Sequence, residues 1–197
     1  MTFFSVFDLK NPSKFFFEFL PAFFRFSTLC IASVKIDDER LKKSAVREMG
    51  SRLVQVRDAA REAMISLNML HVPIVASDTD CFKCIAENYA ELYPYEVMLS
   101  LFICAGDLTE SISNSAVEAL RKYILQKKNT KIDYSTYICQ IIDDHMETDR
   151  VIVPALKALQ VVLTDGHLVT LEVLKRLKLL SANKSKLIQR IMPATVL

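Results

Sequence analysis

Cys81 and Cys84, three positions apart, are the first residues whose type and spacing could do chemistry. This spacing occurs in thiol redox motifs and in zinc sites. A redox motif needs a strand–helix–strand setting that lowers a thiol pKa, and no strand pattern flanks the pair. A structural zinc site needs two more ligands. The remaining candidates form no second close pair: Cys104, Cys139, His71 and His145. We interpret Cys81 and Cys84 as buried or half-buried thiols on one helix face, with zinc binding and redox activity as alternatives.

Four acids surround His145, namely Asp143, Asp144, Glu147 and Asp149. Such a cluster could bind a hard cation or serve acid–base chemistry, but it lacks the spacing of a calcium loop. We expect an exposed turn whose acids lie near the positive end of the next helix. The three histidines are far apart, and a chain with only 3 Gly has no glycine-rich phosphate loop. The sequence therefore predicts a protein that is not an enzyme and carries no cofactor.

The stretch from residue 95 to residue 163 repeats itself with an offset of 39 residues. In each copy an apolar helix is followed by Thr109 or Thr148, then by an acid. A threonine hydroxyl can cap free N–H groups, and an acid favours the positive end of the helix dipole. The matched segments are YEVML with YSTYI from Tyr95 and Tyr134, TES with TDR from the two threonines, and AVEAL with ALKAL from Ala116 and Ala155.

Periods of about 40 residues built from two helices are typical of HEAT and armadillo repeats. A two-helix unit buries its apolar face only by stacking on its neighbours. We therefore predict an all-α fold, a HEAT/armadillo-type α-solenoid of stacked antiparallel helix pairs, over residues 36–192. The predicted helices span 36–70 with a break at 50–51, 78–92, 95–105, 108–126, 133–146, 148–164, 168–180 and 184–191.

Single residues mark several of the expected helix ends. Asp78 or Thr79 is expected to cap a short helix after a linker over residues 71–80. Gly106 is expected to end its helix in the left-handed conformation, which glycine adopts without steric cost. Pro154 lies inside a predicted helix, removes one hydrogen bond and is expected to kink it.

The first 35 residues differ from the rest, because ten of the 12 Phe lie between residues 3 and 26. A membrane-spanning helix needs about 20 apolar residues, whereas the longest uncharged run, residues 26–34, has nine. Interfacial anchoring is an alternative. We expect residues 1–35 to lie outside the fold, as a wrong start or translated non-coding sequence, and residues 193–197 to form a frayed tail. The sequence predicts no membrane span.

Charge is divided unevenly, although the net charge is only +2. Residues 73–166 hold 14 acids and 8 bases, and residues 167–197 hold 6 bases and 1 acid. An acidic middle disfavours nucleic acid as a partner. Arg57 and Arg61, four residues apart, are expected on an outer, solvated helix face. Five Cys without a visible secretory signal indicate reduced thiols and a cytoplasmic protein.

Several segments, taken together in this order and spacing, resemble the C-terminal part of the tubulin-folding cofactor D family. The in-helix proline is part of this resemblance, which covers roughly residues 36–191. The segments are residues 57–73, YEVMLSL from Tyr95, GDLTES from Gly106, and DRVIVPALKAL from Asp149 running on to LTDG at Gly166.

The resemblance implies a long helical solenoid that is not an enzyme. Members of the family hold β-tubulin and assemble or dismantle the αβ-tubulin dimer. They act with other tubulin-folding cofactors and with a small Arf-like GTPase, and the complex activates GTP hydrolysis. By this resemblance the protein is a cytoplasmic, microtubule-associated chaperone fragment. A HEAT scaffold for another complex, in transport or with a phosphatase, is the main alternative.

Two loops occupy equivalent places in the two copies, residues 106–110 and 147–150. They are expected on one edge of the stack, where a partner could contact both. The residues predicted to contact a protein partner are Asp107, Glu110, Asp149 and Arg150. Capping of helix ends and pairing between repeats is the alternative role for these four residues.

Overall fold

The computed structural model describes residues 38–70, 77–126, 132–165 and 170–183. The Phe-rich segment 1–35, the predicted helix 184–191 and the tail 193–197 lie outside these ranges. Within them the chain is helical and has no strand, which confirms the all-α class. The elements are α2 (Asp38–Glu48), α3 (Val54–Ser66), α4 (Asp78–Cys84), the π-helical turn η2 (Ile85–Tyr89), α5 (Pro94–Ala105), α6 (Glu110–Ala119), the π-helical turn η3 (Leu120–Leu125), α7 (Tyr134–His145), α8 (Asp149–Asp165) and α9 (Leu171–Asn183).

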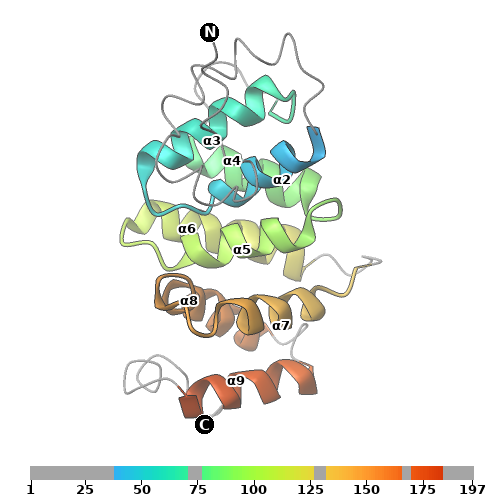
Figure 1. The fold of residues 1–197 in the computed structure, drawn as a ribbon, viewed down its shortest axis with the longest axis vertical. Helices are drawn as coiled ribbons and strands as arrows, with labels where there is room; N and C mark the ends of the chain where they lie inside the picture. Colours follow the sequence, from blue (N-terminus) through green and yellow to red (C-terminus); the bar gives the residue numbers. More distant parts are fainter. Residues whose placement is uncertain (1–37, 71–76, 127–131, 166–169, 184–197) are drawn as a thin grey trace, which may run out of the picture.

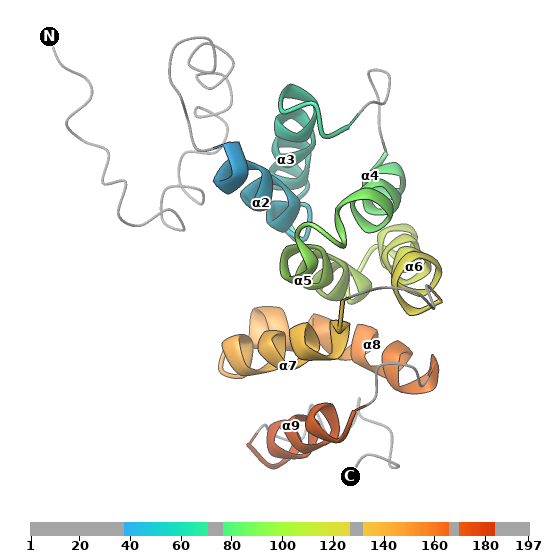
Figure 2. The same cartoon turned by 90° about the vertical axis from the view of Figure 1, so that its right-hand side faces the viewer.

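The helices lie across the long axis of the molecule, from α2, α3 and α4 at one end to α9 at the other (Figure 1). Helix α2 packs on α5, α5 on α7, and α7 on α9. A quarter turn of the view places these four helices above one another, with α4, α6 and α8 beside them (Figure 2). In this second column α4 packs on α6, and α8 packs on η3.

Helix α5 is the centre of the core because it is apolar on nearly every side. Eight of its twelve residues are buried: Val97, Met98, Leu99, Ser100, Leu101, Phe102, Cys104 and Ala105. A helix that is hydrophobic all round has to be covered all round. Helices α2, α6, α7 and α8 all pack against it.

Polar side chains of α5 donate hydrogen bonds to backbone carbonyls that have no partner within the neighbouring helix α2. The last carbonyls of a helix have no partner within that helix. The buried Ser100 hydroxyl donates to the Val46 carbonyl of α2 at 2.5 Å. One turn later, the Cys104 thiol donates to the Met49 carbonyl at 3.5 Å. The end of α2 is therefore capped by side chains of α5.

Two glycines let helix ends approach their neighbours at backbone distance. A Cβ on Gly50 would lie 2.6 Å from the Cα of Ser100 in α5, and a Cβ on Gly106 would overlap the backbone of Pro154 in α8. The left-handed conformation predicted for Gly106 is wrong, because its φ is −97° and its ψ is 13°. Glycine stands at this position because of close approach and not because of its backbone angles.

Two predicted N-caps are also wrong. Ser77, and not Asp78 or Thr79, caps α4: its hydroxyl accepts from the Asp80 N–H, and the Asp80 carboxylate accepts from the Ser77 N–H. The hydroxyl of Thr109 makes no capping hydrogen bond at the start of α6. The Thr109 N–H donates instead to the Asp107 carboxylate at 2.8 Å. The cap of α4 thus lies one residue before the predicted positions, and α6 begins without a side-chain cap.

Replacing Gly106 with alanine should destabilise the fold by about 1–3 kcal/mol, the usual cost of overpacking. The added methyl group meets the backbone of Pro154, which cannot rotate away. Chemical denaturation followed by circular dichroism measures the change. Asn114→Ala, on the exposed side of α6, is the matched control and should be neutral or slightly stabilising. Equal stability of the two variants would contradict the close contact.

Candidate interaction surfaces

The four predicted contact residues are not equivalent in the structure. Glu110, Asp149 and Arg150 are exposed, at the start of α6 and of α8. Asp107 faces inward, with only 9% of its side chain exposed, and its Oδ2 lies 3.9 Å from Arg57 Nη1. Asp107 is therefore engaged in pairing, the role that the sequence offered as the alternative, whereas the other three residues are exposed.

A buried charge network links α3, α4 and the turn between α5 and α6. The Arg57 side chain is only 1% exposed. Its Nε donates to Asp78 Oδ2 at 3.2 Å and its Nη1 donates to the Ser51 carbonyl at 2.7 Å. The second oxygen of Asp78 accepts from Arg61 Nη2 at 2.7 Å. Together with Asp107, these groups neutralise and orient a guanidinium that water does not reach.

The prediction that Arg57 and Arg61 are solvated is therefore wrong. The helical period places residues on faces, but it does not show which face a later segment covers. Asp78 lies 21 residues and Asp107 50 residues beyond Arg57 in the chain. The sequence did contain a signal for the burial of Arg57, because this residue falls next to the apolar stripe that contains Ala60 and Met64. A charge beside such a stripe becomes buried when a partner carboxylate reaches it.

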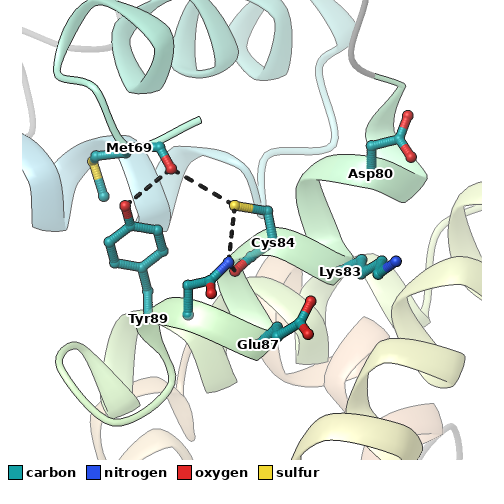
Figure 3. Close-up of a pocket in the computed structure, with 7 residues that line it drawn as sticks. Met69, Asp80, Lys83, Cys84, Glu87 and Tyr89 are labelled. Atoms are coloured by element: carbon teal, nitrogen blue, oxygen red, sulfur yellow. Dashed lines mark hydrogen bonds between the residues drawn. The ribbon is translucent and has the colours of Figure 1, made fainter. Parts of the chain in front are cut away.

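Cys84, but not Cys81, borders a cleft with a volume of about 450 Å³ between the turn that follows α3 and the α4–η2 segment (Figure 3). The Met69 carbonyl accepts from the Tyr89 hydroxyl at 2.9 Å and from the Cys84 thiol at 3.7 Å. The Asn88 amide donates to the Cys84 sulfur at 3.6 Å. Asp80, Lys83 and Glu87 also line this cleft (Figure 3). The Cys84 thiol is thus engaged in hydrogen bonds and half-buried.

Neither thiol has the electrostatics of a reactive cysteine. Burial raises the pKa of Cys81 from 9.0 to about 11, and the nearby Arg61 opposes this only in part. Burial also raises the pKa of Cys84. A nucleophilic or redox thiol needs a lowered pKa, since the thiolate is the reactive form. In the described ranges no group of three or more His, Cys, Asp or Glu could hold a metal ion.

The acidic cluster at the end of α7 serves contacts between helices. Asp143 accepts from Arg176 Nε of α9 at 2.8 Å. Asp144 accepts from the Tyr95 hydroxyl of α5 at 2.8 Å. The ring nitrogen Nε2 of His145 lies 3.3 Å from the same hydroxyl. Helix α7 is thereby joined to the helix before it in the stack and to the helix after it.

These observations define a class: in the described ranges the protein consists of stacked helices, with two clefts that lie between neighbouring elements. No helix in the described ranges is long and apolar enough to cross a membrane. No solved structure gives a significant match to this chain. A family model described as "Tubulin folding cofactor D C terminal" matches residues 40–190. The chain therefore belongs to the tubulin folding cofactor D family, with the C-terminal part of which it aligns.

Asp78→Asn should lower the free energy of unfolding by about 2–3 kcal/mol. The variant loses the negative charge that Arg57 and Arg61 share. Removing one partner of a fully buried pair typically costs about 3–5 kcal/mol, and the cost is smaller here because Asp78 is 19% exposed. Asp58→Asn is the matched control: its carboxylate is 52% exposed and 3.3 Å from Arg61. The control should change stability by less than about 0.5 kcal/mol. Similar losses in urea denaturation of both variants would show that the network is not buried.

Alkylation of the folded protein at pH 8 should leave Cys81 and Cys104 unmodified. Cys81 is 0% and Cys104 is 1% exposed. A pKa of about 11 instead of 9.0 also lowers the thiolate fraction of Cys81 at this pH about a hundredfold. Peptide mass spectrometry after iodoacetamide treatment measures each site, and the protein unfolded in denaturant is the control in which both react. Rapid labelling of Cys81 in the folded protein would favour the redox alternative.

Proposed function

We propose that this chain is a protein-binding helical module that captures β-tubulin during assembly or dismantling of the αβ-tubulin dimer. The family match over residues 40–190 supports this proposal, because it includes nearly every described residue. In this proposal the module acts with other tubulin-folding cofactors and a small Arf-like GTPase, and it promotes GTP hydrolysis only as part of that complex. It is not an enzyme by itself, and it works in the cytoplasm in association with microtubules.

The proposed architecture is a HEAT/armadillo-type α-solenoid. Two observations support it: the sequence offset of 39 residues between the α5–α6 and α7–α8 pairs, and the packing of α2, α5, α7 and α9 each on the next. Solenoids bind partners along an extended surface built from equivalent positions of successive repeats. A large globular partner such as tubulin suits that geometry better than a small ligand does.

The proposed contact region consists of the exposed residues Glu110, Asp149 and Arg150. Gly106 packs against Pro154, which lies about one and a half turns beyond Asp149 in α8. The start of α6 and the start of α8 therefore approach the same interhelical contact. Exposed side chains there can be contacted without disturbing the core. We leave Asp107 out of the proposed contact region, because its carboxylate lies beside Arg57 and accepts from the Thr109 N–H.

Arg150→Glu should reduce β-tubulin capture several-fold, because a reversed charge repels the carboxylate that an exposed arginine attracts. Its melting temperature should stay within a few degrees, since surface substitutions change stability little. A pull-down of purified β-tubulin with the full chain measures capture. Arg52→Glu is the matched control, because it makes the same charge change at an exposed residue in the α2–α3 turn.

Three outcomes would count against this assignment. Equal loss of capture and of melting temperature would give Arg150 a structural role. Equal loss of capture in both variants would indicate an effect of net charge. A pull-down from cell extract that contains another complex and no tubulin would support a general HEAT scaffold.

A further inference from the structure

Leu108 is the most exposed large apolar residue in the described ranges, with an exposed fraction of 89%. It lies in the turn between α5 and α6, which spans residues 106–109. This turn is at one side of the stack, the same side as the turns that follow α2 and α7 (Figure 1). Helices stack on one another along the long axis, so neighbours in the stack leave turns at its side uncovered. Leu108 is therefore exposed where a partner can approach.

The backbone on both sides of Leu108 is held in place. Before it, Gly106 packs against the backbone of Pro154 in α8. After it, the Thr109 N–H donates to the Asp107 carboxylate at 2.8 Å. A side chain that is presented by a fixed turn brings little further ordering cost when a partner binds. Leu108 is thus positioned for a contact before any partner arrives.

Two more apolar residues are exposed on the adjoining turn. Leu53 and Val54, where α3 begins, are each more than half exposed. The turn before them meets the α5–α6 turn at Arg57, whose Nη1 donates to the Ser51 carbonyl at 2.7 Å and lies 3.9 Å from Asp107 Oδ2. Single exposed apolar residues are common on protein surfaces, whereas a group of them marks a site of contact. The two turns together carry such a group.

We propose that Leu108 is an apolar anchor that enters a pocket on the surface of β-tubulin. The anchor is continuous with the proposed contact region, because Leu108 is two residues from Glu110 and its turn packs on α8, which begins at Asp149. The exposed residues at the start of α3 widen the same apolar surface. This inference rests on the proposed function and adds the kind of tubulin surface that the contact region recognises: binding depends on apolar complementarity as well as on charge.

Leu108→Asn tests the anchor, because asparagine is branched like leucine but polar. In a pull-down of purified β-tubulin with the full chain, this variant should capture at least about fivefold less, since the contact no longer buries a leucine side chain. Leu108→Met should stay within about twofold, because methionine is apolar and similar in volume. Leu92→Asn is the matched control: Leu92 is 65% exposed and lies in the turn between η2 and α5, at the opposite side of the stack (Figure 1).

The control should also leave capture within about twofold. All three variants should keep their melting temperature within a few degrees, since the substituted residues are exposed. Salt distinguishes the anchor from a charged contact, because it screens exposed charges. Raising the salt concentration should shrink the effect of Arg150→Glu on capture, and it should leave the loss caused by Leu108→Asn unchanged.

Photo-cross-linking tests the contact directly. Replacing Leu108 with the photoreactive p-benzoylphenylalanine should give a cross-link to β-tubulin, and the same replacement of Leu92 should give none. Unchanged capture by Leu108→Asn, an equal loss in Leu92→Asn, a matching loss of melting temperature, or a cross-link to a second copy of the chain alone would overturn the anchor and leave the proposed function in place. No capture of β-tubulin by the unmodified chain would overturn the proposed function, and the anchor with it.

Discussion

The structure depends on the burial of α5, in which eight of twelve residues are buried. A helix with apolar residues on every side gains stability only when neighbours exclude water from all of it. Helices α2, α6, α7 and α8 meet that requirement together. Their positions are then fixed by hydrogen bonds, because Ser100 and Cys104 donate to the open carbonyls at the end of α2. At the C-terminal end of α5, the Ser113 hydroxyl of α6 donates to the Ala105 carbonyl at 2.6 Å.

Close approach of two helices also requires either a small residue or a fully paired polar group at the point where they cross. Gly50 and Gly106 provide the space, so that backbone meets backbone where a side chain would separate the helices. Arg57 shows the opposite solution, a large cation buried with its partners. Burying a charge is costly, and the attraction of Asp78 and Asp107 offsets that cost only in one relative placement of α3, α4 and the α5–α6 turn. The network therefore favours a unique arrangement of these elements.

The residues that remain exposed for partners are those that the contacts between helices do not use. Asp107 is taken into the network, whereas Glu110 and Arg150 stay exposed on neighbouring segments. A groove between α2 and α7 exists because both helices pack on α5 and leave its first turn open. The contact residues that we propose, Glu110 and Arg150, thus lie on two different helices of the stack.

The sequence by itself determined the helical class of the described ranges, the repeat of 39 residues and the family, because apolar spacing and matching motifs are local features. It placed the break at Gly50 and the helix after Pro94 correctly. Only the tertiary structure decided that Arg57 is buried, that Gly106 makes room for Pro154, and that Lys43 and Tyr137 line one groove. Each of these depends on residues far apart in the chain. Helical periodicity gives the faces of a helix, and only packing determines which faces are covered.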